Sequence, residues 1–121
     1  MEAELLFVYG TLMRGFALHA LLERCADFVG LGQAAGLLFD LGRYPAALPG
    51  GGGLIHGEVY RLRDPGSWLA LDSAEGSQYH RGETGVRMVG GKRVTAYVYW
   101  YVGPLSRAVP IPGGDYRIHH R

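Results

Sequence analysis

The stretch Leu5-Leu6-Phe7-Val8-Tyr9-Gly10-Thr11-Leu12 begins as a continuous apolar run and is interrupted by a glycine. A run of this kind, over residues 5–8, is consistent with a buried β-strand. A strand that stops at Gly10 leaves backbone N–H groups free beside a possible helix start, and such groups bind anions. The stretch therefore predicts the first strand of the fold and, directly after it, a backbone cradle for an anion.

The clearest helix pattern lies in the middle of the chain, between Asp64 and Gly76. Asp64 can cap a helix, Pro65 suits its first position, and Gly76 is placed to end it. The apolar face of this helix is formed by Trp68, Leu69 and Leu71. The pattern leaves the carboxylate of Glu75 at the end of the helix. A solitary carboxylate and an anion cradle together suggest acid–base chemistry on a small, charged, amide-bearing substrate.

Glycines divide the remainder of the chain into short apolar and aromatic segments. Leucine spacing predicts a short helix within residues 16–24. We expect a flexible loop over residues 49–53 and a tail after Gly103-Pro104 that wraps the surface. Further strands are predicted over residues 27–31, 36–41, 54–62, 86–89 and 94–102, the last two joined as a hairpin at Gly90-Gly91.

These segments predict a small α+β protein with about six strands and about two helices. Residues 94–102 are apolar on both faces, as expected inside a barrel or under a covering element. A mixed β-barrel or strongly curved sheet fits this pattern, and so does an open sandwich, because periodicity does not separate them. With 121 residues, the chain (1–121) should form a single domain.

The composition argues against several classes of function. Hydrophobic residues make up 48% of the chain and charged residues 19%, which is typical of a globular protein. A formal net charge of +1 gives no reason to expect a nucleic-acid partner or an anionic membrane surface. The apolar runs are shorter than the ~20 residues that span a bilayer, and the acidic start is unlike a signal peptide. Because Cys25 is the sole cysteine, we expect a cytoplasmic protein.

The ordered set of motifs resembles the gamma-glutamylcyclotransferase-like family, in its small avirulence-induced-protein-like branch. The matching segments are residues 9–12, 57–60, 71–76 with Tyr79 and Arg81, and 94–99. Members of this family convert gamma-glutamyl amides or peptides to 5-oxoproline and release an amine or amino acid. The resemblance implies a mixed-strand β-barrel with a substrate cavity at one mouth. It also implies a small-molecule substrate with a gamma-glutamyl group. We expect a monomer or small homo-oligomer without a cofactor.

Carried over position by position, the resemblance places the catalytic carboxylate on Glu75. The substrate-binding cradle falls on Tyr9, Gly10, Thr11 and Leu12. Because some members of the wider family lack activity, the alternative is a non-catalytic barrel that binds a small metabolite or a protein with the same pocket.

The chemistry of such a reaction makes modest demands on the protein. The α-amine of a gamma-glutamyl amide attacks the γ-carbonyl of the same molecule, so no Ser or Cys nucleophile, metal or redox cofactor is needed. The enzyme is a lyase by outcome and an acyl transferase by mechanism. One carboxylate can move the protons in sequence. The helix C-terminus, and burial beside Trp68 or the aromatic strand, should raise the pKa of Glu75 and suit it to this role.

Three other residues have two interpretations each, and a fourth, Tyr116, has one. Tyr79 either lines the pocket through its hydroxyl or is simply a buried aromatic. Arg81 either fixes the surroundings of Glu75 by a salt bridge or is exposed. Glu58 is a second pocket carboxylate or, as we slightly prefer, a surface strand residue. Tyr116 could form a lid over the cavity.

The histidines and the cysteine suggest no metal or nucleophile site. Ligand spacing is unconvincing among His19, His56, His80, His119 and His120. The terminal His119-His120 pair is expected to be exposed. Cys25 lacks an obvious catalytic partner and is interpreted as a half-buried apolar filler.

Overall fold

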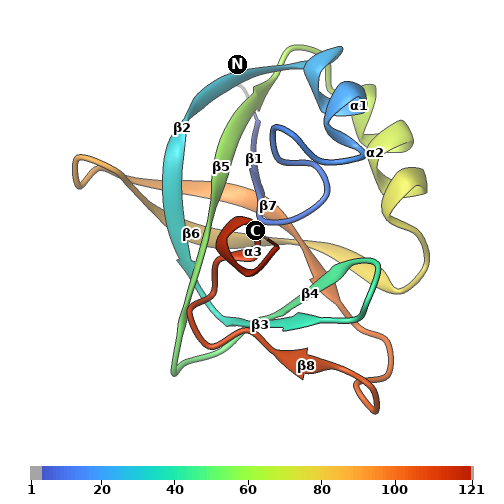
Figure 1. Cartoon of the computed structure of the whole chain (residues 1–121). Helices are drawn as coiled ribbons and strands as arrows, with labels where there is room; N and C mark the ends of the chain where they lie inside the picture. The colour runs from blue at the N-terminus through green and yellow to red at the C-terminus, as the bar shows by residue number, and fades with distance from the viewer. Residues whose placement is uncertain (1–3, 121) are drawn as a thin grey trace.

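A computed structural model describes residues 4–120 and shows a closed mixed barrel (Figure 1). The strands follow one another around the barrel in the order β1-β5-β2-β6-β7. Their bounds are β1 Leu5–Val8, β2 Ala26–Ala35, β5 Leu54–Leu62, β6 Tyr79–Met88 and β7 Arg93–Tyr101. Strand β7 closes on β1 in parallel, with Leu6 opposite Tyr97, while the other neighbours are antiparallel. The predicted α+β fold with a mixed-strand barrel is confirmed.

Besides the barrel, the part of the chain that the structure describes contains a second, smaller sheet and three short helices. The sheet has the order β4-β3-β8 and lies below the barrel in Figure 1, where β4 packs against β7. Its strands are β3 Leu37–Asp40, β4 Pro45–Leu48 and β8 Val109–Pro110. The helices are α1 His19–Glu23, α2 Ser67–Glu75 and α3 Tyr116–His119. None of the helices within residues 4–120 is long and apolar enough to cross a membrane.

Several element boundaries differ from those predicted. The predicted helix over residues 16–24 is reduced to α1, because hydrogen-bonded turns occupy the chain between Gly10 and His19. The predicted strand over 27–31 continues to Ala35 as the long strand β2. The predicted strand over 86–89 is the end of β6, which begins at Tyr79 in a polar, glycine-containing sequence.

Two elements of the small sheet and the last helix were missed by the sequence analysis. Strand β4 lies directly before the glycine-rich loop of residues 49–53, in a stretch for which no element was predicted. Strand β8 and helix α3 order the tail, which hydrogen-bonds to β3 and β5 through Ile111 and Gly114. Residues 4–120 therefore contain one helix more than predicted.

Helix α2 ends as predicted but starts later than predicted. Its first residue is Ser67, and Asp64 instead accepts a hydrogen bond at Oδ1 from the Gly66 N–H at 2.9 Å. Gly76 ends the helix with φ of 91°, a conformation that favours glycine. This sharp turn fixes Glu75 as the last helical residue and leads the chain towards β6.

The second half of strand β7, residues 98–101, is buried on both faces, in agreement with its apolar pattern, whereas Arg93 and Thr95 at its start are exposed. Val98 and Tyr99 alternate in direction along the strand, yet both are almost fully enclosed. The barrel interior supplies one environment and β4 covers the other side. The core is formed by residues such as Leu6, Phe7, Ile55, Val59, Leu71 and Val86. The site described next lies beside this core.

Candidate active site

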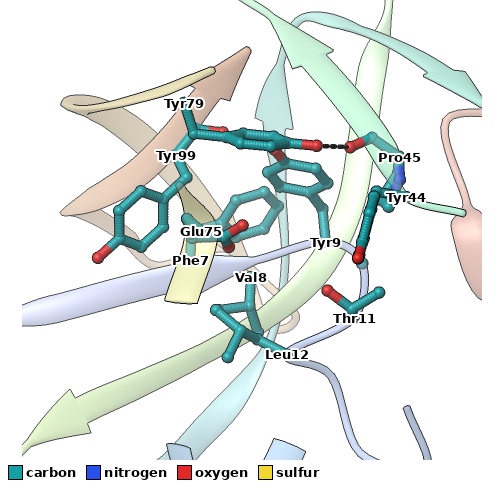
Figure 2. Close-up of a pocket in the computed structure, with 11 residues that line it drawn as sticks. Phe7, Val8, Tyr9, Thr11, Leu12, Tyr44, Pro45, Glu75, Tyr79 and Tyr99 are labelled. Atoms are coloured by element: carbon teal, nitrogen blue, oxygen red, sulfur yellow. Dashed lines mark hydrogen bonds between the residues drawn. The ribbon is translucent and has the colours of Figure 1, made fainter. Parts of the chain in front are cut away.

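One pocket gathers all the site residues proposed from the sequence (Figure 2). It lies where the end of β1, the start of β4, the end of α2 and the start of β6 meet. Its empty space, counted with the open solvent at its mouth, is about 310 Å³. The wall consists of Phe7, Val8, Tyr9, Gly10, Thr11, Leu12, Tyr44, Pro45, Glu75, Tyr79 and Tyr99. Glu75 and the loop after β1 thus belong to the same small space.

Glu75 is half-buried in an aromatic environment. Figure 2 shows its carboxylate among the rings of Phe7, Tyr9 and Tyr79. Burial raises the pKa of Glu75 to about 7, because the ionised form loses hydration there. Within residues 4–120 no side chain or N–H group hydrogen-bonds to this carboxylate, although its oxygens are not enclosed. The carboxylate therefore opens onto the pocket and is able to exchange a proton near neutral pH.

Trp68 plays no part in that environment. Its indole N–H donates to the Glu4 carboxylate at 2.9 Å, and the guanidinium of Arg81 stacks 4.1 Å from the centre of its ring. Of the two surroundings that we proposed for Glu75, the structure supports the aromatic strand, through Tyr99, and not Trp68.

The tyrosine hydroxyls around the pocket are engaged in holding it together. Tyr79 donates to the carbonyl of Pro45 at 2.7 Å, and Tyr9 donates to the carbonyl of Tyr99. Burial, followed by the charge of Glu75, raises the pKa of both Tyr9 and Tyr79, so both hydroxyls stay protonated. Tyr79 thus contributes its ring to the wall, while its hydroxyl joins β6 to the start of β4.

The loop after β1 has free backbone donors. The carbonyls of Gly10 and Thr11 accept hydrogen bonds from Met13 at 3.0 Å and Leu18 at 2.9 Å. Within the described part of the chain, the N–H groups of Gly10, Thr11 and Leu12 donate to no other residue. Consecutive free N–H groups in a turn form an anion-binding concavity. Residues 10–12 therefore have the donors that a bound carboxylate or oxyanion requires.

Gly10 also has a packing role. A Cβ atom at this position would collide with the ring of Pro45. The glycine therefore lets the end of β1 approach the start of β4 and thereby narrows the pocket.

Arg81 does not contact Glu75. Its guanidinium lies 3.6 Å from the Asp72 carboxylate, which in turn accepts a hydrogen bond from the Tyr99 hydroxyl at 2.7 Å. Arg81 is half-buried, so neither of the two interpretations proposed from the sequence is right. The arginine instead helps to fix α2 against β6 and β7. The contact is made through Asp72, which lies about one helical turn before Glu75 on α2.

Glu58 is neither a surface residue nor part of the Glu75 pocket. It is only 4% exposed, and it accepts hydrogen bonds from the Tyr60 hydroxyl at 2.8 Å and the Arg14 N–H at 3.1 Å. The Arg117 guanidinium, from α3, lies 3.0 Å from its other oxygen. The surface interpretation that we preferred is wrong, because β5 is enclosed on both faces at this point. Glu58 joins the tail to the loop after β1.

The tail residues also differ in part from expectation. Tyr116 is 2% exposed, packs against Phe16 and does not line the Glu75 pocket, so it is not a lid. His119 and His120 are exposed, as expected, but lie 2.8 Å and 3.7 Å from the Asp40 carboxylate. The three side chains offer ligand atoms within 4.8 Å of one another, an arrangement that sequence spacing did not reveal. Cys25 is half-buried, as expected.

Tyr44 and Pro45 are among the pocket residues that sequence reasoning missed, together with Phe7, Val8 and Tyr99, which were predicted only as strand residues. Tyr44 and Pro45 stand at the start of β4, in a stretch for which the sequence analysis predicted no element. The apolar run Pro45–Leu48, which follows Gly42 and two larger residues, was the available signal for a short strand.

A carboxylate of raised pKa, a turn with free N–H groups and an aromatic wall define a candidate acid–base site on a small mixed barrel. Comparison with known proteins places this barrel in a family. Residues 6–118 match the family described as gamma-glutamyl cyclotransferase, AIG2-like, and the chain belongs to that family. The resemblance noted from the sequence motifs is thereby confirmed.

Individual relatives support this assignment. The gamma-glutamylcyclotransferase family protein YtfP of Escherichia coli K12 is 35% identical over 81 residues, which are 65% of this chain and 66% of YtfP. The structure of YkqA from Bacillus subtilis has a TM-score of 0.81 at 28% identity, and covers 98% of this chain but 41% of YkqA. An AIG2-like protein from mouse has a TM-score of 0.81 at 27% identity, with 96% and 89% of the two chains covered. This chain spans just under two thirds of YtfP and less than half of YkqA.

Proposed function

We propose that this protein is a gamma-glutamyl cyclotransferase that acts on a gamma-glutamyl amine or gamma-glutamyl amino acid. The products are 5-oxoproline and the free amine. The observation that carries this proposal is the position of Glu75, with its pKa raised to about 7, in the same pocket as the free N–H groups of residues 10–12. A glutamyl group needs both partners at once, since it carries an anionic carboxylate and a nitrogen that must lose protons.

In the proposed reaction the substrate supplies its own nucleophile. The ionised Glu75 carboxylate accepts a proton from the α-ammonium group, and the free amine attacks the γ-carbonyl carbon to close a five-membered lactam. The protonated Glu75 then donates to the departing nitrogen as the amide C–N bond breaks. The second proton of the attacking nitrogen passes through the same carboxylate, which leaves a lactam N–H and the ammonium form of the released amine. Overall, two protons leave the α-nitrogen and two arrive at the departing nitrogen, so one carboxylate can serve first as base and then as acid.

The protein accelerates this reaction by position and by charge. Holding the glutamyl chain in its reactive conformation gives access to the effective molarities of ~10⁵ M or more found for well-oriented intramolecular reactions. The free N–H groups of residues 10–12 bind the α-carboxylate and can also stabilise the oxyanion that develops on the γ-carbonyl oxygen. A pKa near 7 suits Glu75 to both halves of the proton transfer at neutral pH.

The test is a panel of gamma-glutamyl amines and gamma-glutamyl dipeptides, assayed for release of 5-oxoproline and, in parallel, for binding. Glu75→Gln is the informative variant and Glu83→Gln, at an exposed position on β6, is its matched control. We expect release of 5-oxoproline by the unchanged protein and by Glu83→Gln. Binding of panel members without turnover in any of the proteins would favour the non-catalytic barrel over the enzyme.

A further inference from the structure

A second hollow lies directly outside the Glu75 pocket. The two spaces share Tyr44, Glu75 and Tyr79 as a common wall. From there the outer hollow continues over Leu18, Leu41 and Gln78, between the loop before α1, the end of β3 and the turn after α2. Its empty space, including the solvent at its open side, is about 740 Å³. Glu75 thus stands at the passage between the two spaces.

The position of Glu75 decides which space the departing amine occupies. The nitrogen that leaves must receive its proton from this carboxylate, so it has to lie within hydrogen-bonding reach of it. The glutamyl part fills the inner pocket, and the amine therefore extends into the space on the other side of Glu75. A third hollow, bounded by Asp72 and Arg81, also reaches Tyr79, but Glu75 is not in its wall.

The wall of the outer hollow is uncharged apart from Glu75 itself. Leu18 and Leu41 are half-buried, and Tyr44 presents an exposed ring. The polar groups are the side chains of Ser77 and Gln78 and the phenol groups, with no arginine, lysine, aspartate or second glutamate among the described lining residues. Away from Glu75, a charged group at the far end of the amine would find no partner of opposite charge among these residues, while an alkyl or aromatic group would bury apolar surface.

We propose that the outer hollow is the subsite for the released amine, and that it selects amines with an apolar alkyl or arylalkyl chain over amines that carry a second charge. This inference rests on the proposed function, because it takes Glu75 as the proton donor to the departing nitrogen. It adds the chemical class of the leaving group, which the family assignment leaves open.

Binding to the Glu75→Gln protein tests the subsite separately from turnover. The probes are the gamma-glutamyl amides of isoamylamine, of cadaverine and of 5-aminopentanoic acid, of which the first ends in a shorter, uncharged branched alkyl group and the other two carry a positive and a negative charge at the far end. Burying about 60 Å² of apolar surface corresponds to about tenfold in affinity. We therefore expect the isoamyl derivative to bind about tenfold more tightly than either charged derivative, and equal affinities would overturn the proposal.

Two substitutions of Leu41 locate the preference. Leu41→Asp should reverse it in favour of the cadaverine derivative, and Leu41→Ala should weaken isoamyl binding about threefold without affecting gamma-glutamyl methylamide. The matched control is Leu69→Asp, at a 79% exposed position on α2 beside the third hollow. A change of preference in Leu69→Asp, with none in the Leu41 variants, would place the amine in the third hollow and overturn the proposal.

Turnover by the unchanged protein separates this inference from the proposed function. If the isoamyl preference and its dependence on Leu41 are found but no 5-oxoproline is released, the subsite stands and the enzymatic function fails. If 5-oxoproline is released from all three derivatives at equal rates and they bind equally well, the function stands and the subsite fails.

Discussion

Burial of Glu75 favours acid–base chemistry at neutral pH but lowers the stability of the folded protein there. A carboxylate with a pKa near 7 can exchange protons at neutral pH, which suits a proton shuttle. The same burial makes the ionised form costly to enclose. Since the pKa in the folded protein is raised above the usual value of about 4.3, the folded state binds more protons than the unfolded state between the two values. The stability of the protein therefore falls as the pH rises through this interval.

The first prediction follows from this linkage. Glu75→Gln removes the buried charge, so the variant should be more stable than the unchanged protein at about pH 8, by roughly 1–3 kcal/mol. Below about pH 4 the difference should largely disappear, because Glu75 is then protonated in both states. Urea unfolding at both pH values measures this, and Glu83→Gln should show no such trend. A variant that is less stable at about pH 8 would mean that ionised Glu75 is stabilised by its surroundings.

The second prediction concerns turnover at the same residue. Glu75→Gln keeps the shape of the side chain but removes its proton exchange, so 5-oxoproline release should fall at least ~10²-fold. Substrate binding should change little, because the N–H groups of residues 10–12 are untouched. In the unchanged protein, kcat/KM should rise with pH through about 7, as the base becomes ionised. Near-normal turnover in the variant would exclude Glu75 as the shuttle.

Among the elements, β1 and β4 approach each other closely at the wall of the site. The end of β1 reaches β4 where Gly10 faces the ring of Pro45. The Tyr79 hydroxyl holds the same end of β4 from the side of β6. Strand β4 is short, so its place depends on these contacts and on β3 more than on its own sequence.

The third prediction tests this contact. Gly10→Ala should destabilise the protein by roughly 1–3 kcal/mol, because the added methyl group overlaps Pro45. It should also weaken substrate binding, since relief of the overlap moves β4 and the pocket wall. The control is Gly85→Ala on β6, where a Cβ would meet nothing within 4 Å. Unfolding and substrate titration distinguish the two effects, and an unchanged stability of Gly10→Ala would show that β4 yields without cost.

The elements that the sequence predicted are those whose pattern is local. Strands β1, β5 and β7 have apolar runs or alternation, and α2 has a terminating glycine. Helix α3 is too short to have such a pattern. It is held by the Asp115 cap, which accepts from the Ile118 N–H at 3.1 Å, and by the ion pair of Arg117 with Glu58. Such distant contacts leave little trace in a single sequence.

The distinction between local patterns and distant contacts applies to the candidate site as well. Glu75 and residues 9–12 were found because each ends a recognisable element and matches a family motif. Tyr44 and Pro45 were missed because β4 reaches the pocket only through the small sheet. Glu58 was misjudged because strand alternation does not show that β5 is enclosed on both faces.

At the scale of the whole molecule, the C-terminal tail connects the barrel to the small sheet. Strand β8 pairs with β3, and the Gly114 carbonyl accepts from the His56 N–H of β5 at 2.8 Å. Arg117 then reaches Glu58 and donates to the Arg14 carbonyl at 2.7 Å. The tail thereby fixes the loop that follows β1, which carries the candidate cradle.

The last prediction separates this structural role of Glu58 from a catalytic one. Glu58→Ala leaves the Tyr60 hydroxyl and the Arg14 N–H without their buried acceptor, so it should cost roughly 2–4 kcal/mol of unfolding free energy. Arg117→Ala should cost less, roughly 1–2 kcal/mol, because the guanidinium is half exposed and Glu58 keeps two donors. A double-mutant cycle should give a coupling of ~0.5 kcal/mol or more, since the two groups are in direct contact.

Activity provides the decisive comparison for these two variants. Glu58 lies outside the Glu75 pocket, so the folded fraction of Glu58→Ala should retain turnover within a few-fold of the unchanged protein. Glu83→Ala, at an exposed position, is the control for the loss of a carboxylate from a barrel strand. If Glu58→Ala loses turnover while its unfolding free energy is unchanged, then Glu58 takes part in the chemistry and the assignment to Glu75 is wrong. Loss of stability with retained turnover would instead establish that this buried glutamate positions the tail, while Glu75 alone faces the substrate.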